Sequence, residues 1–168
     1  TLDTLIANPK HNSLSYYSEG SHSRWCWCDA LFMAPPVYAR LYTLTGDEKY
    51  MEFASSEYKA TYDKLYDVEE RLFFRDASYI NKKEANGQKV FWGRGNGWGM
   101  GGLAEILKAL PADDKRYRPF YEKLFVEMCD RLAGLQQEDG CWHASLLDPA
   151  SYPAPETSAT GFMTYAMA

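Results

Sequence analysis

The stretch that decides the fold is Trp98-Gly-Met-Gly-Gly-Leu-Ala-Glu-Ile-Leu-Lys-Ala-Leu110, which is apolar and rich in glycine and is followed by Pro111. Apolar residues at helical spacing predict a helix that ends at this proline. A more amphipathic helix is predicted over 115–137, with Asp139-Gly140 ending it. An apolar helix followed by an amphipathic one is typical of a helical hairpin with one screened and one half-exposed member.

The same order recurs on both sides of this hairpin. Upstream, a helix is predicted from Trp25 to Leu44, bent or divided at Pro35-Pro36, and a second one from about Glu48 to Leu65. Downstream, a third apolar helix begins near Ser158. The first helices of the pairs start near residues 25, 95 and 158, which is a weak structural repeat without repeated sequence. This pattern fits either a toroid with two concentric layers or an ordinary helical bundle.

Residues 67–89 break the helical pattern. The run Leu72-Phe73-Phe74-Arg75-Asp76 predicts a short strand, Asn86-Gly87 predicts a turn, and Val90-Phe91-Trp92 is the expected partner strand. We therefore expect a small β-hairpin inserted between the first two helical pairs.

Composition narrows the function classes. The chain has 168 residues, and its 18 Lys and Arg against 23 Asp and Glu give a net charge of −5, which argues against a nucleic-acid partner. No apolar run approaches the ~18 residues that predict a membrane span. The chain begins at Thr1 and ends inside an apolar stretch, which we interpret as a fragment. Aromatic residues make up 15% of the chain, which a core can absorb, but rings crowded beside Gly, Arg and Asp in short segments indicate a binding surface.

The aromatic residues are concentrated in the loops that enter the apolar helices, at 16–29, 74–98 and 142–160. These loops hold all five tryptophans and a set of polar residues: Trp25, Trp27, Trp92, Trp98 and Trp142, with Asp29, Asp76, Arg94, Asn96, His143 and Glu156. Aromatic faces cover the C–H faces of a pyranose, carboxylates and amides bind its hydroxyls, and Arg binds an anionic sugar's carboxylate in a fork. If the apolar helices run parallel, these loops form a sugar-binding end.

Two carboxylates in these loops have alternative interpretations. Asp29 opens an apolar helix, so it is either a cap or a carboxylate held in a buried setting. Asp76 ends the expected strand, so it is either a turn residue paired with Arg75 or a proton-donating acid among aromatic rings.

The glycines at 93, 95 and 97 lack the context of a nucleotide-binding loop. They either let Arg94 and Asn96 approach a ligand closely or form a tight packing turn. His143 is either structural or part of a site. No paired His spacing indicates a metal, so we expect neither metal nor cofactor.

Taken together and in this order, the segments resemble glycoside hydrolase family 105, the unsaturated rhamnogalacturonyl hydrolases, which are related to the family 88 unsaturated glucuronyl hydrolases. The segments are Arg24–Met33 (RWCWCDALFM), Thr45-Gly46-Asp47, Leu72–Asp76, Phe91–Trp98, Asp139–Trp142 and Pro155–Ser158. The resemblance implies an all-α (α/α)6 toroid. Residues 1–168 would be part of one catalytic domain and supply about two and a half of its six hairpins.

The resemblance also implies a reaction and a partner. An Asp protonates C4 of a 4,5-unsaturated uronic acid at the non-reducing end of an anionic oligosaccharide, water adds at C5, and the sugar is released as a 5-keto product. By motif, Asp76 would be the general acid/base and Asp29 the second carboxylate. The substrate would be bound by Trp25, Trp27, Trp92, Arg94, Asn96, Trp98, Trp142, His143 and Glu156. Pectin-derived substrates imply a periplasmic or extracellular location, or a cytoplasmic one.

One segment departs from the family. Family members carry a His-containing aromatic segment where this chain has Phe73-Phe74-Arg75. Because a guanidinium beside the acid would lower its pKa, we expect the Arg75 side chain to point away from Asp76. Two alternatives stay open: a toroid enzyme that acts on saturated sugars, as a hydrolase or an epimerase, and a non-catalytic helical-repeat binding module.

Overall fold

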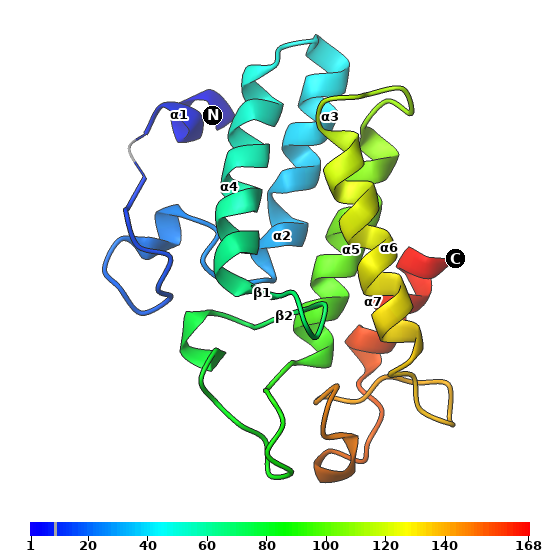
Figure 1. Cartoon of the computed structure of the whole chain (residues 1–168). Coiled ribbons are helices and arrows are strands. Elements are labelled where there is room, and N and C mark those ends of the chain that lie inside the picture. The colour runs from blue at the N-terminus through cyan, green and yellow to red at the C-terminus, as the bar shows by residue number, and fades with distance from the viewer. Residues whose placement is uncertain (9) are drawn as a thin grey trace.

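The computed structural model describes residues 1–8 and 10–168, which form a mostly helical fold with two short strands (Figure 1). The α-helices are α1 (Leu2–Ala7), α2 (Ala30–Met33), α3 (Pro35–Thr45), α4 (Lys49–Leu65), α5 (Gly93–Ala109), α6 (Arg118–Ala133) and α7 (Thr157–Met167). The strands are β1 (Tyr66–Asp67) and β2 (Leu72–Phe73), and short 3-10 turns lie at Ser21–Ser23, Ala77–Tyr79 and Pro149–Ser151. The predicted helical hairpins are confirmed, and Pro35 divides the first predicted helix into α2 and α3.

Helix α5 is the centre of the packing, because it contacts α2 and α3 on one side and α7 on the other. Its glycines permit this approach. A Cβ added at Gly97 would lie 3.2 Å from the Cα of Ala159, and one at Gly102 would overlap the carbonyl group of Leu31. Gly97 and Gly102 therefore serve helix packing, since a side chain at either position would push a neighbouring backbone away.

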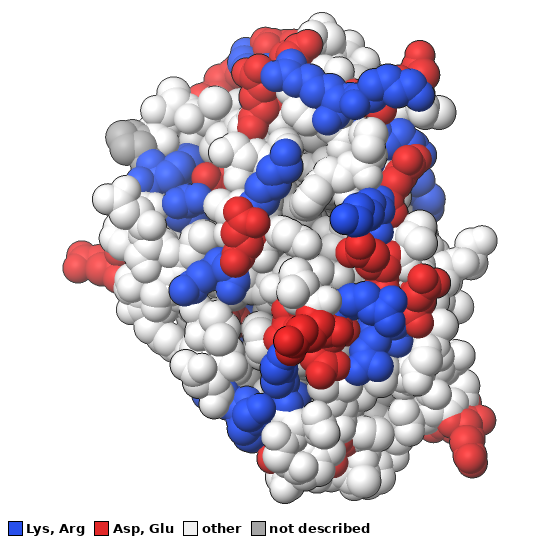
Figure 2. All heavy atoms as spheres, in the orientation of Figure 1, with Lys and Arg blue, Asp and Glu red and all other residues white. Residues whose placement is uncertain are grey.

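Helices α4 and α6 form an outer layer on α3 and α5. Their buried faces meet through the rings of Tyr58 and Tyr121, whose centroids are 5.1 Å apart in an edge-to-face arrangement. The face shown in Figure 2 carries cationic and anionic side chains side by side. On α6, the Nε of Arg118 lies 2.6 Å from Oε1 of Glu122. The two layers match the amphipathic pattern of the sequence.

The helices α3, α5 and α7 run in the same direction, and the loops that enter α5 and α7 lie at the lower end of the molecule in Figure 1, while the loop that enters α2 lies at its left side. The expected pairing of strands in these loops is wrong. Strand β2 pairs with β1, with Tyr66 opposite Phe73. The backbone around Trp92 pairs instead with Ser145. β1 follows α4 directly, so the four residues after it close a local turn at little entropic cost.

The turn at Asn86-Gly87 is present, with Gly87 in the left-handed region at φ 85° and a bridge between Lys83 and Lys89 at its base. Helix α5 begins at Gly93, five residues before the predicted start at Trp98. Arg94 and Asn96 therefore project from the first turn of a helix rather than from a flexible loop.

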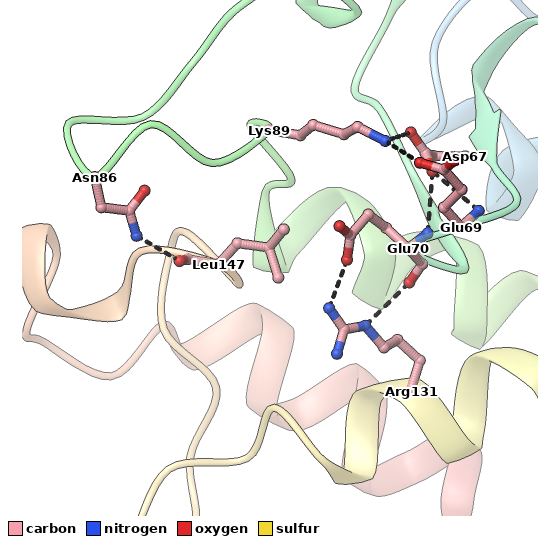
Figure 3. A network of polar contacts seen from close by, with 7 residues as sticks. All are labelled: Asp67, Glu69, Glu70, Asn86, Lys89, Arg131 and Leu147. Atoms are coloured by element: carbon pink, nitrogen blue, oxygen red, sulfur yellow. Dashed lines mark hydrogen bonds and ion pairs between the residues drawn. The ribbon is translucent and has the colours of Figure 1, made fainter.

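A network of polar contacts, the polar frame, connects the β1–β2 turn, the 83–89 turn, helix α6 and the loop before α7 (Figure 3). Its members are Asp67, Glu69, Glu70, Asn86, Lys89, Arg131 and Leu147. The Nζ of Lys89 lies 2.6 Å from Oδ2 of Asp67, and Nη2 of Arg131 lies 2.6 Å from Oε2 of Glu70. These contacts hold the loops at the end where the inner helices begin.

Candidate active site at the helix entry end

A cavity of about 310 Å³ opens among the loops that enter the three inner segments. This volume lies at the lower end of the range for small-molecule sites. Its lining residues come from all three loops: Asp29, Arg75, Tyr79, Trp92, Arg94, Gly95, Ala144 and Glu156. Of the residues expected at a site, Asp29, Trp92, Arg94 and Glu156 thus lie together.

Arg94 presents an exposed guanidinium at the first turn of α5. Within residues 1–8 and 10–168 it forms no ion pair and no side-chain hydrogen bond, so its fork of donors is open to a ligand. A guanidinium in this state suits a planar anion such as a carboxylate.

Asp29 precedes α2 but does not cap it, because its side chain makes no hydrogen bond to the helix N–H groups. Its Oδ2 instead accepts from the Sγ of buried Cys28 at 3.5 Å. Burial raises the pKa of the Cys28 thiol, and the neighbouring charge of Asp29 raises it further, so the thiol keeps its proton. The capping interpretation of Asp29 is therefore wrong, and its carboxylate faces the cavity.

Asp76 is fully buried and is not among the residues that line the cavity. Its Oδ1 accepts a hydrogen bond from the N–H of Ser78 at 2.8 Å, and its backbone forms a bridge with Trp27. Its Oδ2 has no hydrogen bond with any described residue. A buried carboxylate oxygen that accepts no hydrogen bond is costly, which makes Asp76 a candidate for a functional role.

The expectation that Arg75 points away from Asp76 is wrong. The Nε of Arg75 lies 3.0 Å from Oδ2 of Asp76, within ion-pair distance although the N–H is not aimed for a hydrogen bond. The guanidinium is held in place by the rings of Tyr16 and Tyr79, whose centroids are 5.1 Å and 5.4 Å away. Arg75 and Tyr79 were missed as lining residues. An Arg followed by a Tyr four residues later, in the loop that carries the expected acid, was the available signal.

Two residues expected to bind substrate are part of the core instead. Asn96 is fully buried, and its amide accepts from the N–H of Phe73 at 2.8 Å and donates to the C=O of Phe73 at 3.1 Å. It therefore continues the edge of β2 as a backbone strand would. Trp142 is buried, and its indole N–H donates to the C=O of Leu132 at 2.8 Å. Both side chains have their polar groups satisfied inside the protein.

Glu156 combines two roles. Its carboxylate caps α7 by accepting hydrogen bonds from the N–H of Ala159 and the hydroxyl of Ser158, and it also lines the cavity. His143 is half-buried, with Nδ1 3.4 Å from the C=O of Pro149 and Nε2 without a hydrogen bond among the described residues.

The remaining tryptophans lie outside the cavity lining. Trp98 packs between the rings of Phe32 and Phe162, with centroids 4.8 Å and 4.2 Å away, where α2, α5 and α7 meet. Trp27 packs edge-on against Tyr16, which is one of the two rings that flank the guanidinium of Arg75.

Trp25 packs against Tyr38 and Phe53 at the other side of α2. It lines a separate cavity with residues of α1 and α3. The structure thus divides the five tryptophans: Trp92 lines the cavity, and the other four pack against neighbouring side chains.

In residues 1–8 and 10–168, no group of three or more His, Cys, Asp and Glu side chains is arranged to hold a metal ion. Over the same ranges, no helix is both long and apolar enough to cross a membrane.

The model of one protein family, described as Glycosyl Hydrolase Family 88, matches residues 1–168. The chain belongs to glycosyl hydrolase family 88. The expected resemblance to unsaturated glycuronyl hydrolases is thereby confirmed at the level of the family. A solved structure, a glycosyl hydrolase family 88 protein from Bacteroides vulgatus, superposes with a TM-score of 0.86 at 38% identity over 98% of this chain and 44% of its own. A family 105 glycoside hydrolase from C. acetobutylicum has the same fold, with a TM-score of 0.76 at 24% identity over 99% of this chain and 48% of its own.

Curated relatives carry more specific names. This family 88 chain is 46% identical, over 90% of its length and 41% of the relative, to an "Unsaturated 3S-rhamnoglycuronyl hydrolase" of Formosa agariphila. It is 42% identical to a protein of the same name from an Alteromonas species, over 97% of the chain and 40% of the relative. An "Unsaturated rhamnogalacturonyl hydrolase YesR" of Bacillus subtilis is 30% identical over 79% of the chain and 38% of the relative. The chain spans about two fifths of the length of these relatives.

Proposed function

We propose that the whole protein releases a 4,5-unsaturated uronic acid from the non-reducing end of a rhamnose-containing oligosaccharide. The observation that carries this proposal is the cavity at the helix entry end, where the exposed guanidinium of Arg94 and the carboxylate of Asp29 lie next to the segment that holds Asp76. Membership in family 88 and the names of the curated relatives support the same class of substrate.

In this proposal each lining group has a task. The fork of Arg94 binds the C6 carboxylate of the uronic acid, because an exposed guanidinium without an internal partner loses little on exchanging water for a planar anion. The face of Trp92 covers the sugar ring, and Asp29 accepts from its hydroxyls. Our proposal that the protein is close to the family 105 enzymes is supported by the sequence motifs alone.

Asp76 is the proposed general acid/base. Its carboxylic acid gives a proton to C4, and the positive charge that develops at C5 is shared with the ring oxygen. Water adds to C5 and returns a proton to the Asp76 carboxylate. The C5 hemiketal opens to a ketone, which leaves a hemiacetal at C1 that releases the aglycone as an alcohol. The Oδ2 of Asp76, which accepts no hydrogen bond within residues 1–8 and 10–168 and lies 3.0 Å from the Nε of Arg75, is the atom that would face C4.

The part of the substrate that decides selectivity is the aglycone. Glucuronic and galacturonic acid differ only at C4, and this carbon is trigonal in the 4,5-unsaturated sugar. The glycone therefore carries no record of which acid it came from. We accordingly propose a rhamnoglycuronyl substrate, in line with the relatives of higher identity, rather than a specifically galacturonyl one.

The proposal is tested by giving the whole protein an unsaturated rhamnoglycuronyl disaccharide and following the loss of the absorbance of the sugar's conjugated alkene. Asp76→Asn should lower kcat by about 10³-fold, within the range that general acid–base catalysis supplies. Its folding should persist, because the amide oxygen still accepts from Ser78.

The matched control is Asp67→Asn, which changes a partly buried carboxylate of the polar frame and should leave kcat within about twofold, since frame residues lie outside the cavity lining. Absence of turnover in the wild-type protein, or undiminished turnover in Asp76→Asn, would contradict the proposal. Turnover of the saturated disaccharide instead would support a different carbohydrate enzyme.

A further inference from the structure

The ring of Tyr152 stands at the edge of the cavity. Tyr152 follows the 3-10 turn Pro149–Ser151 in the loop before α7, and its ring centroid lies 5.4 Å from that of Trp92 at an interplanar angle of 77°. Trp92 lines the cavity, whereas Tyr152 lies outside the lining and is 38% exposed. The two rings therefore form a corner, with one side in the cavity and the other at its edge.

The loop that carries Tyr152 is held by a buried carboxylate. The Oδ2 of Asp148 accepts from the hydroxyl of Ser151 at 2.8 Å and from the backbone N–H of Asn86 at 3.3 Å. The N–H of Tyr152 donates to the C=O of Pro149 at 3.1 Å. Because Asn86 is a member of the polar frame (Figure 3), the frame anchors this loop. A ring on an anchored loop loses little conformational freedom when a ligand covers it.

The surroundings of this ring are apolar and uncharged. The hydroxyl of Tyr152 forms no hydrogen bond within residues 1–8 and 10–168. By contrast, Tyr165 of α7, which is 43% exposed, donates to Glu105 and accepts from Lys108 at 2.8 Å. The segment after Tyr152, Pro153-Ala154-Pro155, is exposed and has no charged side chain. This edge of the cavity therefore suits an apolar part of a ligand rather than an anion.

The size of the cavity places the rest of the substrate at this edge. A volume of about 310 Å³ is small for an oligosaccharide, so a chain whose unsaturated end occupies the cavity must leave it past the edge. In the proposed substrate the next sugar is rhamnose, which has a methyl group where most hexoses have a hydroxymethyl group. This methyl group and the C–H bonds of the ring form an apolar surface that an aromatic face can cover.

We infer that Tyr152 is a specificity-determining residue: its ring covers the rhamnose that is linked to the unsaturated uronic acid and selects this 6-deoxy sugar as the aglycone. The inference rests on the proposed function, because that function places the unsaturated sugar at Trp92. It concerns the aglycone alone and requires nothing of Arg94 or Asp76 beyond the tasks already proposed for them. Since linked sugars are rotated relative to each other, two rings that form a corner can each cover one of them.

The test gives the whole protein three glycosides of the 4,5-unsaturated uronic acid, with L-rhamnose, L-mannose or methanol as the aglycone. L-Mannose is L-rhamnose with a hydroxyl group on C6. In Tyr152→Ala, the ratio of kcat/KM for the rhamnose disaccharide to that for the methyl glycoside should fall by about 5- to 10-fold, through a raised KM for the disaccharide. The preference for rhamnose over mannose should fall by about 3-fold, less than an enclosed pocket gives, because the ring is partly exposed. Tyr152→Phe keeps the ring and should preserve both ratios.

The matched control is Tyr165→Ala, which removes a tyrosine of similar exposure about 12 Å further along α7 from Thr157 and outside the cavity lining. It should change neither ratio. If Tyr152→Ala acted only by disturbing Trp92, turnover of all three glycosides would fall alike and the ratios would stay unmoved, which would overturn the inference alone. Equal kcat/KM values for the rhamnose and methyl glycosides in the wild-type protein would do the same. Absence of turnover of all three by the wild-type protein would overturn the proposed function and the inference with it.

Discussion

The polar frame and the cavity are built from the same residue types but treat their polar groups in opposite ways. In the frame, Arg131 bonds both the carboxylate and the C=O of Glu70, and the amide of Asn86 donates to Leu147 at 2.8 Å. At the cavity, Arg94 has no internal partner within the described residues, and one carboxylate oxygen of Asp76, which is buried beside the lining residue Arg75, accepts no hydrogen bond from them.

This difference distinguishes polar groups that stabilise the fold from polar groups that are available to a ligand. Buried polar groups are normally satisfied, because an unmade hydrogen bond costs about 1–3 kcal/mol. A protein that satisfies its donors and acceptors in one region and leaves them open a few residues away is keeping the second region for an external partner. Three substitutions test this division, beginning with the one of largest expected effect.

Asn96 is not a member of the polar frame but resembles it, because its amide is hydrogen-bonded inside the protein. The sequence pattern had placed it among the substrate-binding residues. Asn96→Ala would leave the N–H and C=O of Phe73 buried without partners, and should lower the free energy of unfolding by about 3 kcal/mol. Urea unfolding measures the loss, and KM should stay unchanged in the folded protein.

The control for this substitution is Asn86→Ala, which removes an exposed amide and should cost about 0.5–1 kcal/mol. A raised KM with unaltered stability in Asn96→Ala would return Asn96 to the substrate-binding residues.

Arg94 is the opposite case. Arg94→Gln should lower kcat/KM for the anionic substrate by about 10- to 100-fold, the value of one or two charge-assisted hydrogen bonds. It should leave the unfolding curve unmoved, because the guanidinium has no partner within residues 1–8 and 10–168. Steady-state kinetics and urea unfolding on the same samples check both statements.

Arg118→Gln provides the reverse control. Arg118 donates to the C=O groups of Leu107 and Leu110 at the end of α5, at 2.8 Å and 3.0 Å, so its loss should lower stability and leave kcat/KM unchanged. If Arg94→Gln destabilised the protein as much as Arg118→Gln without affecting catalysis, the division between frame and cavity would fail at this position.

The sequence was informative where the determining interactions are local. Helix periodicity, the proline that divides α2 from α3 and the turn at Gly87 all depend on neighbouring residues, and the direction of the inner helices then brings the entry loops together. The partner of β2, the role of Asn96 and the direction of Arg75 depend on contacts across the chain. Asn96 and Phe73, for example, are 23 residues apart. A polar residue in an aromatic loop looks the same in sequence whether it faces a strand edge or a ligand.

Lys89→Gln tests the frame alone and has the smallest expected effect. Burial raises the pKa of Asp67, but the Lys89 ammonium and the N–H groups of Glu70 and Glu69 lower it to a net value below its usual range. A carboxyl group with a lowered folded-state pKa adds stability above its unfolded value of about 3.9, and that stability is lost as the pH falls through the folded value.

Lys89→Gln should therefore lower the free energy of unfolding by about 0.5–1 kcal/mol at pH 7, and the two proteins should converge towards pH 3, as urea unfolding across that range would show. Glu69→Gln removes the outer, 82% exposed partner of Lys89 and should leave stability nearly unchanged. A loss in Lys89→Gln that does not depend on pH would assign the contribution of Lys89 to packing rather than charge. A change in KM would show that the polar frame affects substrate binding from a distance, since no residue of the frame lines the cavity.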